Sequence, residues 1–160
     1  MEEFFKSTLW AQFGAAIDML ENAMRACPDP LWTGSRFWYI SYHTLFFLDF
    51  YLSESSENFA PPPGFSLSEL DPSGLLPDRN YTREELLAYL EHCRKKCRAA
   101  IESLTEERAR ERRDFGFLAL PCAEILLYNM RHVQHHAGQL NFILGQQGDS
   151  APRWVRRTQN

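Results

Sequence analysis

The chain has 160 residues, which is enough for one domain with a substantial buried core. Hydrophobic residues make up 44% and charged residues 24%, the usual proportions of a globular protein in water. A net charge of -4 argues against a nucleic-acid partner, because such a partner attracts a basic surplus. Polar residues interrupt the longest apolar stretch, residues 37–52, so we expect no membrane partner.

The cysteines indicate a reducing compartment. There are four, and no two of them form a CxxC pair: Cys27, Cys93, Cys97 and Cys122. The N-terminal sequence lacks the basic region and small-residue cleavage site of a secretory signal, so we expect a cytoplasmic protein with free thiols. Two of the cysteines lie four residues apart on one predicted helix face, where core packing is the simpler interpretation than metal binding.

Two long helices are predicted in the first third of the chain. Apolar residues recur at three- and four-residue steps over 2–26, and Pro28 ends this helix. A second helix is predicted from about Ser35, a candidate N-cap, to Leu52. It is apolar almost all round, so we expect it to be the most buried helix.

The connection that follows, residues 53–80, contains five prolines and is unusually long for a compact domain. Such a segment is typical of a lid or a pocket wall. A third helix is predicted to begin at Thr82, because Glu85 completes the pattern of a capping box. It ends before a strongly charged segment, 105–114, which indicates an exposed turn.

A fourth helix is predicted from about Leu120 to Leu144, with Pro121 in its first turn and Gly145 or Gly148 at its end. No segment has the pattern of a strand. The predicted fold is therefore all-α: a four-helix bundle with one long crossover connection between helices 2 and 3. We expect one domain over residues 1–150 and a C-terminal tail over 151–160.

Histidines in the fourth predicted helix indicate a metal site. His132 and His136 are four residues apart, so their side chains lie about 40° apart on one face of a helix. They belong to a stripe that should point into the bundle, made of Ile125, Tyr128, Asn129, His132, His136, Gln139 and Ile143. Two imidazoles at this spacing can bind the same ion.

His43 occupies a similar position in the apolar second helix, where a lone polar side chain is costly to bury without a partner. A buried histidine is more often a hydrogen-bonded core residue than a ligand, so each histidine alone is ambiguous. Three inward histidines on two helices can all be satisfied by one divalent transition metal ion. Three protein ligands would leave a coordination position open, as in catalytic sites.

Other histidines and one familiar enzyme class fit less well. His135 lies about 60° off the stripe, so we expect it beside the ligands, as we do Gln139. His92 is flanked by charged residues and should be exposed. A zincin peptidase needs His-Glu-x-x-His, but Val133 stands where the glutamate would be, so this activity is not expected.

The histidine in an aromatic second helix, followed by His-x-x-His-His-x-Gly-Gln ending at Gln139, resembles the DinB-like superfamily of four-helix-bundle metalloproteins. The resemblance implies that His43, His132 and His136 hold the metal, usually Zn or Ni, and that the protein is a homodimer. Gly138 is expected to allow close helix packing. The few members with assigned activities resemble transferases or isomerases that use low-molecular-weight thiols such as bacillithiol or mycothiol.

The functional prediction is a metal-dependent enzyme whose open three-histidine site activates a thiol of a small-molecule substrate. We favour a thiol over water because no carboxylate base is evident near the histidine stripe. The alternatives are a metal-dependent hydrolase and a non-catalytic bundle that binds a metal or ligand. A plain structural protein without metal is a third possibility. Candidate catalytic residues near the stripes are Tyr39, Tyr128, Asn129 and Arg36.

Overall fold

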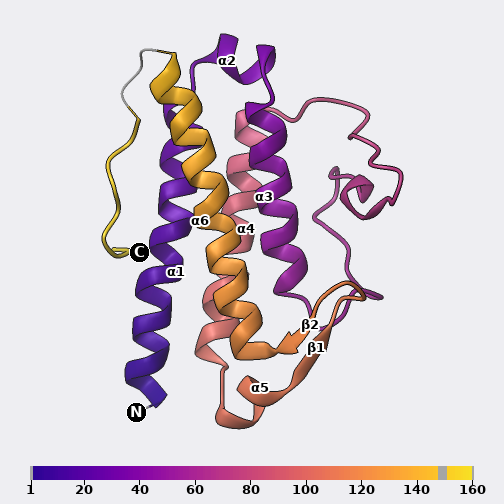
Figure 1. Cartoon of the computed structure of the whole chain (residues 1–160), viewed down its shortest axis with the longest axis vertical. Coiled ribbons are helices and arrows are strands. Elements are labelled where there is room, and N and C mark those ends of the chain that lie inside the picture. The colour runs from indigo at the N-terminus through magenta and orange to yellow at the C-terminus, as the bar shows by residue number, and fades with distance from the viewer. Residues whose placement is uncertain (1, 148–150, 160) are drawn as a thin grey trace.

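The computed structural model describes residues 2–147 and 151–159. Four long helices in this part of the chain lie side by side (Figure 1): α1 (Glu2–Ala26), α3 (Phe37–Tyr51), α4 (Arg83–Glu102) and α6 (Cys122–Gln146). Both α1 and α3 pack against α4 and α6, so the four helices enclose one core. The prediction of a mainly helical, all-α protein is confirmed.

Local sequence signals place two of these helices well. The first helix has the predicted bounds. At the start of α4, the Thr82 hydroxyl accepts a hydrogen bond from the Glu85 amide at 3.2 Å, and the Glu85 carboxylate accepts one from the Thr82 amide at 2.8 Å. The predicted capping box is therefore confirmed. Most of α3 is buried, as its composition predicted.

The connection between α1 and α3 contains a helix that was not predicted, α2 (Asp29–Gly34). Pro28 ends α1 and then serves as the N-cap of α2, because a proline is compatible with a helix start. The start of α3 differs from the prediction by one residue. Arg36 is the N-cap, and the Ser35 hydroxyl accepts a hydrogen bond from the Phe37 amide at 3.2 Å.

The prediction of no strands is wrong. A short hairpin joins the third and fourth long helices, after a brief helix: α5 (Glu106–Arg110), β1 (Arg112–Asp114) and β2 (Ala119–Pro121). Strands of three residues are too short to show an alternating pattern. Gly116 adopts a positive φ of 84° in the turn. Pro121 therefore ends β2 and precedes α6, so it is not in the first turn of the helix.

The C-terminal tail packs along α1, where Figure 1 shows it descending beside that helix. The Thr158 amide donates to the Ala11 carbonyl at 3.0 Å, and the Val155 amide lies 3.2 Å from the Met19 sulfur. Thr158 covers Gly14, where an added Cβ would lie 2.6 Å from the threonine methyl group. The helix α6 ends at Gln146; the alternative end considered above, Gly148, lies outside the described residues.

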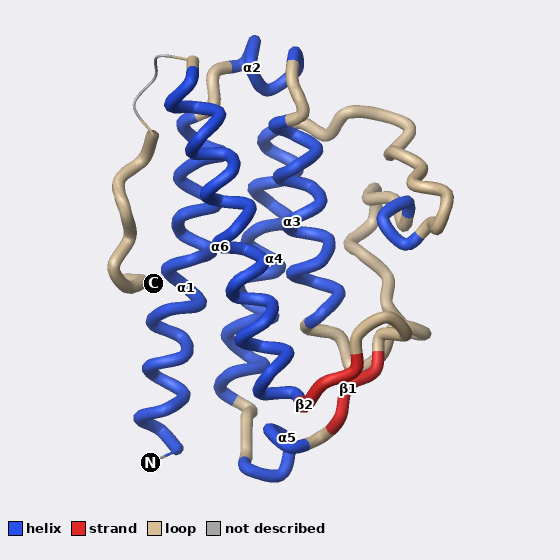
Figure 2. The backbone as a smooth tube through the Cα atoms, viewed as in Figure 1, coloured by secondary structure: helices blue, strands red, loops and turns tan. Residues whose placement is uncertain are grey.

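The long connection between α3 and α4 lies beside α3 and contains one short 3-10 helix, η1 (Ser68–Leu70) (Figure 2). Tyr42 of α3 donates its hydroxyl to the Ser66 carbonyl at 2.6 Å. The Tyr81 hydroxyl, at the end of the connection, accepts from the Ser66 amide at 2.9 Å. Among the described residues, no helix is long and apolar enough to cross a membrane.

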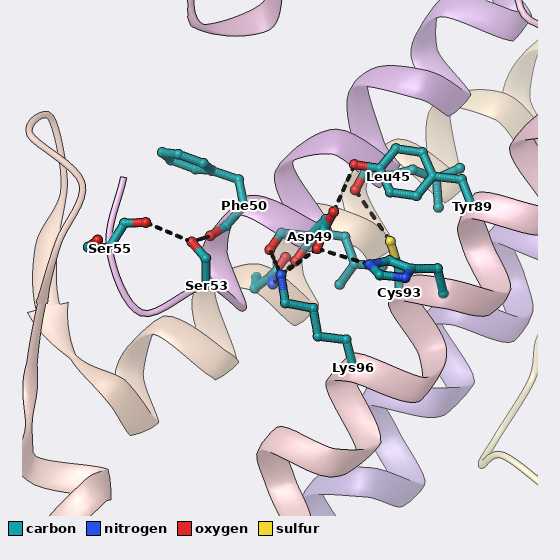
Figure 3. A network of polar contacts seen from close by, with 11 residues as sticks. Leu45, Asp49, Phe50, Ser53, Ser55, Tyr89, Cys93 and Lys96 are labelled. Atoms are coloured by element: carbon teal, nitrogen blue, oxygen red, sulfur yellow. Dashed lines mark hydrogen bonds and ion pairs between the residues drawn. The ribbon is translucent and has the colours of Figure 1, made fainter. Parts of the chain in front are cut away.

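A buried polar network joins α3 to α4 (Figure 3). The Asp49 side chain is 1% exposed and accepts hydrogen bonds from Lys96 at 2.5 Å and from the Tyr89 hydroxyl at 3.0 Å. His92 Nε2 lies 3.6 Å from the same carboxylate, and its side chain is half exposed. Cys93 lies beside this network, donating to the Leu45 carbonyl, and is fully buried as predicted.

Candidate metal centre

Three histidines from two helices face one another across the contact between α3 and α6. The ring centroids of His132 and His136 are 4.5 Å apart, because successive turns of one helix carry them. The His43 ring lies 5.4 Å from that of His132 and 4.8 Å from that of His136. The structure thus brings together the three predicted metal ligands.

The histidines lie at the edge of the core, which differs from the predicted inward stripe. The fully buried face of α6 runs through residues one position later, such as Val133 and Ala137, and the histidines are half buried. His43 is likewise half buried, with a side chain 27% exposed. Phe47 closes the inner side, with its ring 4.9 Å from His43 and 5.8 Å from His132. The group therefore faces an apolar wall on one side and solvent on the other.

Hydrogen bonds fix the orientation of two of the rings. His43 Nδ1 lies 2.6 Å from Glu69 Oε2, and His136 Nδ1 lies 2.7 Å from Gln139 Oε1. Both partners offer oxygen acceptors, so each Nδ1 carries the proton and donates it. This tautomer leaves Nε2 of each ring with a free lone pair, as a metal ligand requires.

The His132 ring has a buried nitrogen that lacks a hydrogen-bond partner. His132 Nδ1 is buried and has no hydrogen-bond partner within the described chain. Buried polar atoms are nearly always satisfied, so an unpaired one in this position calls for a ligand, ion or water. Asn129, one turn away, also carries a buried side-chain oxygen, Oδ1, without a partner in the described chain. It is fully buried and donates to the Leu48 carbonyl at 2.9 Å.

Burial and neighbouring charges favour the neutral form of the two candidate ligands on α6, His132 and His136. Burial, followed by the neighbouring His136 and His43, lowers the pKa of His132 to about 3. Burial also lowers the pKa of His136, against an opposing effect of its hydrogen bond with Gln139. Metals bind the neutral imidazole, so protons compete weakly for these rings at neutral pH.

The donor set fits one divalent transition metal ion. One candidate ligand atom from each histidine lies within 4.8 Å of the other two. A tetrahedral zinc site needs separations of about 3.4 Å between nitrogens, which small rotations of these side chains can provide. Among the described residues, no other His, Cys, Asp or Glu side chains form such a group.

A cavity of about 710 Å³ opens directly beside two of the histidines. His43 and His136 form part of its floor, and the remaining lining is largely apolar: Arg36, Tyr39, Ile40, His135, Gly138, Gln139, Phe142 and Ile143. Burial, and then the nearby Glu69 carboxylate, raises the pKa of Tyr39 to about 12, so this side chain is a neutral phenol at the cavity wall. No carboxylate is part of the lining described by the structure.

A second depression, of about 430 Å³, reaches the same centre beside His132. Tyr128, Arg131, Gln134 and His135 complete its lining. His135 is exposed and borders both spaces. Of the candidate catalytic residues, Tyr39 and Arg36 line the larger cavity, Tyr128 lines the smaller one, and Asn129 lines neither.

Two features of the centre differ from the sequence interpretation. Gly138 does not allow a close helix contact, because an added Cβ would meet nothing within 4 Å. The sequence interpretation did not include Glu69, whose carboxylate lies next to the histidines. It sits in an irregular connection, where no helical spacing relates it to His43, so only tertiary structure reveals it.

Fold and site together define a helical protein with a half-buried three-histidine centre that can hold a metal ion, open to a cavity. A family model for the DinB superfamily matches residues 12–140. The chain therefore belongs to the DinB superfamily. A search of curated proteins finds no match.

Proposed function

We propose that this protein is a four-helix bundle, with the connection 53–80 as its long crossover, that binds one zinc or nickel ion and activates a thiol. His43, His132 and His136 would hold the ion. The convergence of their ligand atoms within 4.8 Å beside an open cavity is the observation that carries this proposal. The membership of the DinB superfamily supports it.

A metal ion bound there would supply a Lewis acid that lowers the pKa of a thiol in the cavity. The chain's own residues provide the rest of the environment. Phe47 and the apolar cavity wall exclude water from one side of the centre. The neutral phenol of Tyr39, which interacts with the Glu69 carboxylate, borders the space that a substrate would occupy. Glu69, the carboxylate beside the centre, is outside the cavity lining and accepts a hydrogen bond from His43, which favours a thiol over activated water.

Arg36 indicates what else the substrate carries. It is exposed at the cavity wall, with its guanidinium 5.2 Å from the Tyr39 ring centroid. No carboxylate in the described part of the chain forms an ion pair with it. Arg36 and His43 are seven positions apart in sequence, so their Cα atoms lie about 10 Å apart along the helix axis. The cavity therefore suits a small molecule that carries a thiol at one end and an anionic group at the other.

The proposal is tested with protein loaded with cobalt in place of zinc. Addition of ω-mercaptooctanoate should produce sulfur-to-cobalt charge-transfer absorption, and the protein should accelerate alkylation of this thiol by monobromobimane. A His136→Gln variant serves as the control and should show neither effect. If the native loaded protein shows neither effect with ω-mercaptooctanoate or with cysteine, the proposed thiol chemistry is wrong.

A hydrolase is the second candidate, and Glu69 is the observation in its favour, because it places a carboxylate next to a metal ligand. Hydrolysis of p-nitrophenyl acetate and p-nitrophenyl phosphate by the zinc-loaded protein separates the two functions. Turnover of either ester by the native protein, without thiol alkylation, would favour the hydrolase. We also propose that the protein is a homodimer, which sedimentation equilibrium measures directly.

A further inference from the structure

A glutamate from the long connection reaches into the histidine group. Glu69 lies on η1, and its Oε2 is 2.6 Å from His43 Nδ1. The Glu69 side chain is only 5% exposed, less than the 27% of His43 itself. A carboxylate in a surface loop is costly to bury unless a partner stabilises its charge.

The partners that the protein provides are incomplete. The second carboxylate oxygen, Oε1, is buried and has no hydrogen-bond partner among the described residues. No lysine or arginine in that part of the chain forms an ion pair with Glu69. His43 offers one hydrogen bond, and the Tyr39 phenol, which carries no charge, also interacts with the carboxylate. A buried carboxylate needs compensating positive charge. A divalent cation bound at the far nitrogen of His43 would provide it through the ring.

We propose that Glu69 is a positioning residue for the metal centre, and this inference rests on the proposed metal site. Its hydrogen bond keeps the proton on His43 Nδ1, directs Nε2 towards the ion and increases the electron donation of the ring. Such carboxylate–histidine pairs strengthen metal binding. Since Glu69 belongs to the connection 53–80, docking of this segment and metal binding stabilise each other.

The connection is built to hold Glu69 in place. Two tyrosines outside the segment hold Ser66: Tyr42, in the middle of α3, binds its carbonyl, and Tyr81, directly after the connection, binds its amide. The Ser66 hydroxyl then accepts from the Ser68 amide at 2.9 Å, directly before Glu69. Tyr42 immediately precedes His43 in α3. Adjacent residues of one helix therefore hold the segment and receive its carboxylate.

The first test compares zinc affinities, measured by competition with a chelator, for Glu69→Gln and for Glu57→Gln. Glu57 is an exposed glutamate of the same connection, so the control carries the same chemical change. We expect a loss of affinity of roughly 10- to 100-fold for Glu69→Gln and none for the control. The d–d absorption of the cobalt-loaded Glu69→Gln protein should also change, which a general loss of stability would not cause.

The outcomes separate this inference from the proposed function. If the native protein binds no zinc, both fail. If it binds zinc and Glu69→Gln binds as tightly as the control, to within threefold, only the role of Glu69 is overturned.

A second measurement uses only the native protein, so it tests the role of Glu69 even if Glu69→Gln does not fold. Coupling between two sites is reciprocal, so zinc must slow amide hydrogen exchange in residues 66–70 of the native protein. The amides of Ser73 and Gly74, in the turn after η1, serve as an internal reference. Equal exchange in residues 66–70 with and without saturating zinc would overturn the coupling.

Discussion

Replacement of Lys96 by methionine should destabilise the protein by about 2–3 kcal/mol. Lys96 donates to both the carboxylate and the carbonyl of Asp49, at 2.5 and 3.0 Å (Figure 3). Methionine keeps the length and apolar character of the lysine chain but leaves the buried carboxylate without its cation. The network holds the C-terminal half of α3 against α4, so its loss should weaken the whole helix bundle.

The size of the expected loss of stability follows from the burial of Asp49 and Lys96. Removal of one partner from a fully buried ion pair costs about 3–5 kcal/mol, because the remaining charge stays uncompensated. Here Asp49 is 1% exposed, but Lys96 is 31% exposed, so part of its charge is already solvated. The Tyr89 hydroxyl continues to donate to Asp49 in the variant. The partial exposure of Lys96 and the remaining hydrogen bond from Tyr89 reduce the expected loss to about 2–3 kcal/mol.

Urea denaturation followed by circular dichroism measures the change, provided that the m-value stays constant. Lys95→Met is the matched control, since Lys95 is 77% exposed and lies 3.6 Å from Glu91. That surface pair should contribute under about 1 kcal/mol. The double variant with Asp49→Asn should lose less than the sum of its parts. Equal stabilities of Lys96→Met and Lys95→Met would refute the reasoning.

Four further predictions concern two glycines, the pH dependence of stability and the cavity. Gly138→Ala should raise the free energy of unfolding by roughly 0.5–1 kcal/mol, because alanine favours the helix and its Cβ meets nothing; Gly14→Ala should lower the melting temperature, because its Cβ would lie 2.6 Å from the Thr158 methyl group. In metal-free protein, the His132 pKa of about 3 lies below the ordinary 6.5, so the unfolded chain binds more protons between these values. Stability should therefore fall as the pH drops from 6.5 to 3, by up to about 1.4 kcal/mol per pH unit, and urea titrations of His132→Gln should show a smaller slope. Arg36→Gln should weaken binding of ω-mercaptooctanoate to the zinc-loaded protein about tenfold and leave octanethiol unchanged, as calorimetry can show; equal effects on both thiols would argue against an anion-binding role.

Sequence patterns predicted the features that depend on neighbours within one helix. The capping box at Thr82 and the extent of α1 depend on local hydrogen bonds and apolar spacing, and both match the structure. The convergence of His132 and His136 follows from a spacing of one helical turn. Adding His43 required an assumption about which helices are adjacent, and α3 does pack against α6.

Features set by tertiary contacts were not predictable in the same way. Helical periodicity placed Asn129 and the histidines on one stripe, but it could not show that Asn129 is in the core while the histidines lie at its edge. Val133 marks the centre of the buried face, one residue after His132. Glu69 reaches His43 only because tyrosines far apart in sequence fix its loop. No local sequence pattern predicts such an arrangement. The two strands of the hairpin, at three residues each, are also too short to show an alternating pattern.

The most direct test of the central claim is the metal content of purified, untagged protein, measured by elemental mass spectrometry. The comparison is a double variant, His43→Ala with His136→Ala, whose fold is checked by circular dichroism. We predict close to one equivalent of zinc or nickel per chain in the native protein and almost none in the variant. Native protein that holds no metal, even after reconstitution with each ion, would contradict the assignment and leave the three histidines as a half-buried polar cluster.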